Sequence, residues 1–193
     1  QRPSPSAALA GRMRLSPDDT VLLLVDMQER LQPLIHDDKG LRARAAALAE
    51  GCRLLGVPIV VTEQYPKGLG PTVPELSGAV EAAGGALAKT SFSCAADPAV
   101  RARLADARRP HVLLAGVEAH ICVLQTALDL LGEGRRVHVV EDAVGSRAPH
   151  SREVGIARMR RHGAEPSCVE TALFELMGGS RHPRFKEVQA LIR

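Results

Sequence analysis

Short, continuous apolar runs alternate with longer segments of helical periodicity along this chain, and that alternation constrains the fold more than any other feature. The runs have the length of strands and are rich in Val, Leu and Ile: they are Val21–Val25, Val57–Val61, Val112–Ala115 and Val137–Val140, with weaker candidates at Ala86–Ala88 and Ala164–Cys168. Unbroken apolarity is typical of strands that are buried on both faces, as in a parallel sheet.

The segments between these runs carry apolar residues at helical spacing. One stripe recurs at steps of four and three between the first two runs: Leu41, Ala45, Leu48, Cys52 and Leu55, with Gly56 as the helix-ending residue. Two further helices are predicted over Ile121–Leu131 and Ser151–His162. Strands that alternate with helices indicate βαβ units, so the sequence predicts a three-layer α/β/α sandwich.

The length of 193 residues suits one domain with a substantial core. No low-complexity linker divides the chain, so residues 18–193 are predicted to form that domain, and residues 1–17 a flexible tail. The apolar stretch near the N-terminus has four residues, too few for a signal peptide. No apolar run approaches the ~20 residues that span a bilayer, so no membrane association is expected.

Charge and cysteine usage limit the partners and the compartment. The formal net charge is +3, signs alternate along most of the chain, and the densest basic group, Arg158, Arg160 and Arg161, has the spacing of a solvated helix face. With one Tyr, three Phe and no Trp, few side chains can stack on bases, so nucleic acid is not an expected partner. Four cysteines without a CxxC pair indicate reduced thiols and a cytoplasmic location.

Three reactive side chains follow predicted strands at the edge where ligands bind in open α/β sheets. Asp26 follows the first run, Lys89 follows Ala86–Ala88, and Cys122 lies one turn beyond Val112–Ala115 at the start of a predicted helix. Each taken singly has an ordinary structural explanation: an Asp that caps a turn, a surface Lys, a core Cys. A carboxylate, an ammonium and a thiol at one edge together predict a nucleophilic site.

Cys122 is the predicted nucleophile among the four cysteines. Unpaired N–H groups and the dipole at a helix start favour a thiolate, and the same amides can bind an oxyanion. Cys52 lies in the apolar stripe and Cys168 in a strand candidate, so both are predicted to be structural. Cys94 follows Lys89 closely, which leaves open a redox role in which Cys94 and Cys122 form a disulfide.

Metal and nucleotide sites have little support in the sequence. The seven histidines are scattered without ligand spacing, and residues 62–65 (TEQY) after the second run contain none. Neither a P-loop nor a complete G-x-G-x-x-G is present. We therefore expect no metal and no cofactor.

Several motifs together resemble the isochorismatase-like hydrolase superfamily. They are DMQERL at 26–31, TEQYPKGLGPTVPEL at 62–76, AKTSFS at 88–93, LLAGVEAHICVLQTALDLL at 113–131 and VHVVEDAVGSR at 137–147. The resemblance extends from about Asp18 to the C-terminus. It implies a six-stranded parallel sheet of Rossmann-like order, a catalytic triad at Asp26, Lys89 and Cys122, and usually an oligomer of two or more copies.

The resemblance also implies a cis peptide bond between Val117 and Glu118, which would turn the backbone amides of Glu118 and Cys122 towards an oxyanion. Family amidases that act on nicotinamide carry an Asp-x-His metal motif where this chain has Glu63-Gln64-Tyr65, so neither that metal nor that substrate is expected here. The expected reaction is hydrolysis of a C–N bond in a small molecule through a Cys122 thioester.

Two aspects of function stay open at this point. Tyr65, Leu69 and Phe92 are the expected substrate-lining residues, but the loops that carry them do not define a substrate. The alternative to an enzyme is a non-catalytic or regulatory ligand-binding protein on the same fold, because a triad alone does not prove turnover.

Overall fold

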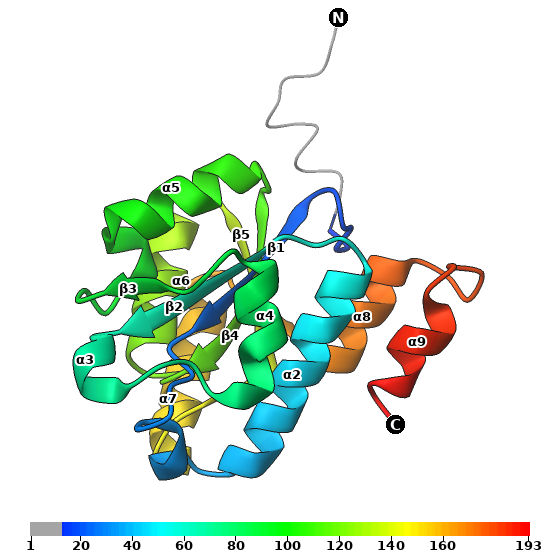
Figure 1. The fold of residues 1–193 in the computed structure, drawn as a ribbon. Helices are drawn as coiled ribbons and strands as arrows, with labels where there is room; N and C mark the ends of the chain where they lie inside the picture. Colours follow the sequence, from blue (N-terminus) through cyan, green and yellow to red (C-terminus); the bar gives the residue numbers. More distant parts are fainter. Residues whose placement is uncertain (1–12) are drawn as a thin grey trace, which may run out of the picture.

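Six parallel strands form one sheet between two layers of helices in the computed structural model, which describes residues 13–193 (Figure 1). The strands are β1 (Thr20–Val25), β2 (Ile59–Gln64), β3 (Leu87–Lys89), β4 (His111–Val117), β5 (Arg136–Gly145) and β6 (Glu165–Ser167), in the order β3-β2-β1-β4-β5-β6. The predicted three-layer α/β/α fold with a six-stranded parallel sheet is confirmed. The strand order reverses between β1 and β4, which is where open sheets of this kind bind ligands.

Two apolar cores, one on each face of the sheet, explain the unbroken apolar runs. In β1, Leu22 and Leu24 belong to one core, while Val21, Leu23 and Val25 belong to the other. Successive side chains of a strand point to opposite faces, so a strand covered on both sides needs an apolar residue at every position.

The helices divide between the two faces (Figure 1). One layer holds α2 (Asp38–Leu54), α4 (Ser77–Ala82), α8 (Val169–Met177) and α9 (Phe185–Ala190); the other holds α5 (Pro98–Ala107), α6 (Cys122–Gly132) and α7 (Pro149–Arg161). Short helical turns occupy the loops: η1 (Gln32–Leu34), α3 (Pro66–Leu69), η2 (Pro74–Leu76) and η3 (Cys94–Ala96). No helix within residues 13–193 has the length and apolarity that a membrane span requires.

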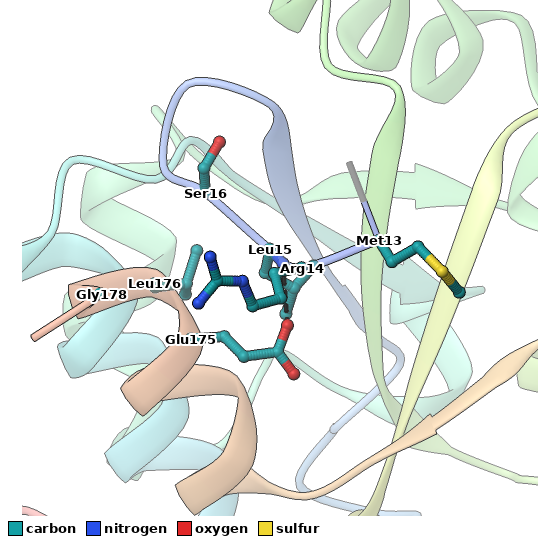
Figure 2. Close-up of a pocket in the computed structure, with 7 residues that line it drawn as sticks. All are labelled: Met13, Arg14, Leu15, Ser16, Glu175, Leu176 and Gly178. Carbon is teal, nitrogen blue, oxygen red and sulfur yellow. Dashed lines mark hydrogen bonds between the residues drawn. The ribbon is translucent and has the colours of Figure 1, made fainter. Parts of the chain in front are cut away.

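The chain before β1 is partly packed into the core. Leu15 lies in the stretch predicted to be a tail, yet its side chain is buried and its backbone N–H donates to Glu175 Oε2 of α8 at 2.8 Å. A cavity of about 530 Å³ lies beside this contact, between residues 13–16 and the end of α8 (Figure 2). Leu15 therefore packs against the domain, and residues 1–12 of the predicted tail lie outside the described residues.

Two buried histidines lie side by side near the amino ends of the strands. His111 Nδ1 of β4 is 2.8 Å from His138 Nε2 of β5. Burial lowers the pKa of both rings, and burial together with the charges of His111 and Arg136 lowers that of His138 to about 4. The charges of Asp19 and Glu175 act in the opposite direction on His111 but do not outweigh its burial. Both rings are thus neutral at pH 7.

This histidine pair predicts an acid-sensitive fold. The unfolded chain binds protons at His138 below its ordinary pKa of 6.5, whereas the folded chain does so below about 4. Stability is therefore fully present above pH 6.5 and is lost as the pH falls towards 4, by ~3 kcal/mol from this residue. Urea unfolding at pH 7 and 4.5 should show a smaller loss in His138→Gln than in the wild type, and equal losses would contradict the assignment.

Candidate active site

The sheet brings the three predicted reactive side chains to its carboxyl edge. Asp26 follows the last residue of β1, Lys89 is the last residue of β3, and Cys122 is the first residue of α6, which follows β4. β1 lies between β2 and β4, and β2 pairs with β3 so that Gln64 is opposite Lys89. Parallel strands end at one edge, so residues distant in sequence meet there.

Asp26 and Lys89 form a buried ion pair. Lys89 Nζ donates to Asp26 Oδ2 at 2.9 Å, and the side chains are 0% and 1% exposed respectively. The second carboxylate oxygen, Oδ1, accepts from Thr62 Oγ1 of β2 at 2.8 Å. The backbone of Asp26 has the left-handed φ of 52°, a conformation that Asp and Asn tolerate better than most residues. The turn after β1 thus fixes both oxygens of this carboxylate.

Oxygen atoms surround the Lys89 ammonium. Besides Asp26, it donates to Gln64 Oε1 at 2.6 Å and to the backbone carbonyls of Ser91 and Phe92, each at 3.0 Å. Burial lowers the pKa of Lys89, but the negative charge of Asp26 and the neighbouring thiols Cys94 and Cys122 raise it by more, so the net shift is upward. Lys89 therefore carries a fixed positive charge at neutral pH.

Cys122 is a thiol rather than a thiolate in the resting site. Its side chain is 7% exposed. Burial and the charge of Asp26 raise its pKa, hydrogen bonding with Asp26 acts in the same direction, and Lys89 only partly opposes them. The expected thiolate is therefore not the resting form, because desolvation and the nearby Asp26 carboxylate raise the pKa of Cys122 by more than Lys89 lowers it. Deprotonation of this thiol would need a base, and Asp26 is the carboxylate whose charge acts on it.

The other three cysteines differ in burial and in contacts. Burial raises the pKa of Cys52 to about 12 within the core on the α2 face. Cys94 is part of the triad's surroundings, with Sγ 3.7 Å from Thr62 Oγ1 and its N–H donated to Thr126 Oγ1 at 2.8 Å. Burial raises the pKa of Cys94 to about 11. Cys168 caps α8, where Sγ accepts from the Thr171 N–H at 3.4 Å.

The turn between β4 and α6 presents two backbone amides without partners. The peptide bond between Val117 and Glu118 is cis. The amide of Ala119 donates to Gly145 O at 2.7 Å, and those of Ile121 and Val123 donate to Glu118 O. Within residues 13–193, the amides of Glu118 and Cys122 donate to no other protein group. They are the two amides expected to face an oxyanion.

Side chains on either side hold this turn in place. The Glu118 carboxylate is buried and accepts from the backbone N–H and the Nε of Arg147 at 3.0 and 2.9 Å. Gly116 approaches β1 so closely that a Cβ there would lie 2.2 Å from Val25 O, and its φ is 121°. Only glycine fits that position without moving the end of β1, which carries Asp26.

Two exposed aromatic residues adjoin Lys89 through their backbones. The N–H of Tyr65 donates to Lys89 O at 2.9 Å, and the carbonyl of Phe92 accepts from Lys89 Nζ. Their side chains are 57% and 54% exposed. Leu69, the third residue expected to line the substrate site, is half-buried in α3. The backbones of Tyr65 and Phe92 therefore adjoin Lys89, and a substrate-lining role for Tyr65, Leu69 and Phe92 stays a prediction.

The place of the family's metal motif does not fit a metal. Glu63 Oε2 accepts from the backbone N–H and the hydroxyl of Thr72 at 2.6 and 3.0 Å, and Gln64 and Tyr65 follow it. In the described part of the chain, no three His, Cys, Asp or Glu side chains are grouped so that they could hold a metal ion. His120, near Cys122, contacts Ser146 Oγ through Nδ1 at 2.8 Å.

Sequence reasoning missed three polar residues that build this site. Thr62 holds Asp26, Gln64 contacts Lys89, and Gln28, which is fully buried, binds the backbone of Gln64. All three residues lie inside segments that resemble the family, Gln28 in residues 26–31 and Thr62 and Gln64 in residues 62–76, and this resemblance was the only signal for them.

The fold and the cluster define a three-layer α/β/α protein with a thiol, a carboxylate and an ammonium at the strand-order reversal. A family model, the Isochorismatase domain, matches residues 20–171, and the chain belongs to this family. A curated relative from Pongo abelii, Isochorismatase domain-containing protein 2, is 46% identical over 191 residues, which cover 97% of this chain and 90% of that protein.

Solved structures share the fold. A Caenorhabditis elegans protein described as MAR1 ribonuclease is 41% identical, with a TM-score of 0.85 over 93% of this chain and 92% of that one. YcaC from Pseudomonas aeruginosa, solved with hexane-2,5-diol and covalent acrylamide, is 28% identical, with a TM-score of 0.87 over 93% and 90%. The Escherichia coli YcaC product, described as an octameric hydrolase of unknown specificity, is 25% identical, with a TM-score of 0.84 over 94% and 95%.

Proposed function

We propose that this protein is a cysteine-dependent hydrolase that cleaves a C–N bond of amide type in a small molecule. The observation that carries the proposal is the buried Asp26 carboxylate, which forms an ion pair with the Lys89 ammonium and whose negative charge acts on the Cys122 thiol. A base, a fixed cation and a nucleophile are the groups that such acyl transfer needs. The hydrolase family and the covalent acrylamide adduct of the Pseudomonas aeruginosa relative support it.

In the first half-reaction, Cys122 Sγ attacks the carbonyl carbon while Asp26 takes the thiol proton. A C–S bond forms and the carbonyl oxygen gains negative charge, which the free amides of Glu118 and Cys122 would stabilise. One such donor can contribute ~3 kcal/mol to the transition state. Asp26 then gives the proton to the leaving nitrogen as the C–N bond breaks, which leaves a thioester on Cys122.

In the second half-reaction, water attacks the thioester carbon while Asp26 takes a proton from the water. The C–S bond breaks, the acid product leaves, and the proton on Asp26 returns to Cys122 Sγ. No net oxidation occurs and each proton passes through Asp26, so the cycle needs neither a metal nor a cofactor. Tyr65, Leu69 and Phe92 would border the leaving group or the acyl chain.

A panel of small primary amides and ureido compounds tests the proposal. Ammonia release and a mass increase on Cys122 equal to the acyl group would support it. Labelling of Cys122 without turnover on every compound would favour a ligand-binding protein instead. An RNA oligonucleotide belongs in the same panel, because the Caenorhabditis elegans relative is described as a ribonuclease; cleavage of RNA alone would reject the amide assignment.

We expect turnover to be independent of metal. Glu63 is hydrogen-bonded to Thr72, and the chain has no Asp-x-His pair at this place. The proposed proton transfers run through Asp26 and need no metal. Activity measured after exhaustive dialysis against a chelator should stay within about twofold of the untreated value. Loss of activity that zinc or iron restores would reject this prediction.

We also propose that the protein forms a homodimer or a larger homo-oligomer. Nucleic acid and membranes are not expected to be its partners. The octameric description of the Escherichia coli relative supports self-association. Light scattering at micromolar protein should give a mass of at least twice that of one chain. A monomer under those conditions would contradict the proposal.

A further inference from the structure

The Lys89 ammonium has more acceptors than it has protons to donate. An ammonium carries three N–H groups, and four oxygens lie within 3.0 Å of Nζ: Asp26 Oδ2, Gln64 Oε1 and the carbonyls of Ser91 and Phe92. Three of these four oxygens are neutral. We call that group, Gln64 Oε1, Ser91 O and Phe92 O, the lysine cradle. The cradle by itself matches the three N–H groups of Lys89.

The orientation of Gln64 is fixed on both sides of its amide. Its Oε1 accepts from Lys89 at 2.6 Å, while its Nε2 donates to Thr90 O at 2.9 Å, so the oxygen faces the ammonium. A flipped amide would direct N–H groups at a cation and lose both hydrogen bonds. The side chain of Gln64 thus supplies a neutral acceptor whose direction is set by the loop after β3.

Gln28 anchors the backbone of Gln64. Gln28 Oε1 accepts from the Gln64 N–H at 2.7 Å, and Gln28 Nε2 donates to Gln64 O at 2.9 Å and to Gly70 O at 2.8 Å. Gln28 stands two residues after Asp26, and its own N–H donates to Asp26 O at 3.0 Å. The buried Gln28 side chain therefore holds Gln64, which faces Lys89, against the turn that carries Asp26.

We propose that Gln64 is a positioning residue that keeps Lys89 in place during the part of the cycle when Asp26 carries the proton. The inference rests on the proposed function. When Asp26 takes the Cys122 proton it loses its charge and ceases to hold the ammonium as an ion pair. The lysine cradle then satisfies all three N–H groups, so the cation stays beside the reacting centre and remains protonated. Asp26 is left free to move the proton.

Gln64→Glu tests the proposal with a substitution of nearly equal shape. A carboxylate beside Lys89 would neutralise the cation that favours the Cys122 thiolate, and an adjacent charge of this kind shifts a pKa by about one unit or more. The rate of Cys122 alkylation by iodoacetamide, followed by peptide mass spectrometry at fixed pH values between 6 and 10, should therefore fall about tenfold relative to the wild type at the same pH. This readout requires no substrate.

Gln189→Glu is the matched control. Gln189 is half-buried on α9 and its Oε1 also accepts from a cation, Arg193 Nη2 at 3.4 Å, far along the chain from the triad. It receives the same change of charge without a contact to Lys89. We expect its alkylation profile to match the wild type.

Gln64→Met provides a second variant that adds no charge. It keeps the length of the side chain but removes the neutral oxygen, so Lys89 must keep its bond to Asp26 and the carboxylate becomes a poorer proton acceptor. Alkylation of Cys122 should slow several-fold with a profile moved to higher pH. If Gln64 is only the structural last residue of β2, then folded Gln64→Met will be alkylated at Cys122 with the same pH dependence as the wild type. That result would overturn the proposal.

The outcomes separate this inference from the proposed function. Preferential labelling of Cys122 in the wild type, with unchanged profiles in both Gln64 variants, would reject the cradle and leave the nucleophile standing. A wild-type protein in which Cys122 takes up neither iodoacetamide nor an acyl group from any amide of the panel would reject both. If Gln64→Glu does not unfold cooperatively, Gln64→Met alone decides.

Discussion

Cys122→Ala is expected to lower amide turnover at least ~10³-fold, because the proposed reaction forms a C–S bond that alanine cannot supply. The substitution should cost no more than ~1–2 kcal/mol of folding free energy, since it removes one small atom at the edge of the core. Ammonia release at saturating amide and urea unfolding measure the two effects separately.

Cys52→Ala is the matched control for this prediction. Cys52 is fully buried on α2, in the core on the opposite face of the sheet from Cys122. Its replacement should reduce stability while leaving kcat unchanged. Turnover that persists in Cys122→Ala would show that another group, such as an Asp26-activated water, performs the hydrolysis, and the thioester mechanism would then be discarded.

The strands were predictable because their apolar runs report burial on both faces directly. Val21–Val25 is all but one residue of β1, and Val112–Ala115 lies within β4. Boundaries were less accurate where polar residues continue a strand: β2 begins at Ile59 and continues through Gln64, and β5 runs on to Gly145 through Glu141 and Asp142. Backbone pairing to a neighbouring strand, which composition does not report, decides those ends.

The start of α8 shows a different limit of prediction from sequence. Its start is capped by the thiol of Cys168, which accepts from the Thr171 N–H, whereas sequence reasoning looks for Ser, Thr, Asp or Asn at that position. The segment Ala164–Cys168 was predicted as a strand, and β6 covers only Glu165–Ser167 within it. A cap with an uncommon side chain conceals the helix that follows.

The positions of the triad residues followed from the strand ends, but their protonation did not. A helix start and a nearby Lys predict a lowered pKa for Cys122, and both features are present. Burial and the Asp26 charge reverse the sign, and these depend on how closely three separate segments pack. Gln28 is a similar case: as a glutamine in a polar stretch it resembles a surface residue, and only tertiary contacts show that it is buried.

Lys89→Met is expected to be the most destabilising of the substitutions at the triad, by about 3–5 kcal/mol, because it leaves a buried carboxylate without its counter-charge. Asp26 would retain the Thr62 hydroxyl but lose the ammonium at 2.9 Å. The double variant Asp26→Asn, Lys89→Met should recover most of that loss, because neither charge remains. Asn also tolerates the left-handed backbone at position 26, where φ is 52°.

Urea unfolding of Asp26→Asn, Lys89→Met, the double variant and the wild type gives the coupling free energy between the side chains of Asp26 and Lys89. We expect it to exceed about 2 kcal/mol, as for charges removed together from a buried pair. Arg184→Met is the control: it breaks the half-exposed ion pair with Glu187 on the surface and should cost less than ~1 kcal/mol. A Lys89→Met loss as small as that of Arg184→Met would mean that Lys89 does not hold Asp26 electrostatically. The fixed cation on which both the hydrolase mechanism and the lysine cradle depend would then have to be abandoned.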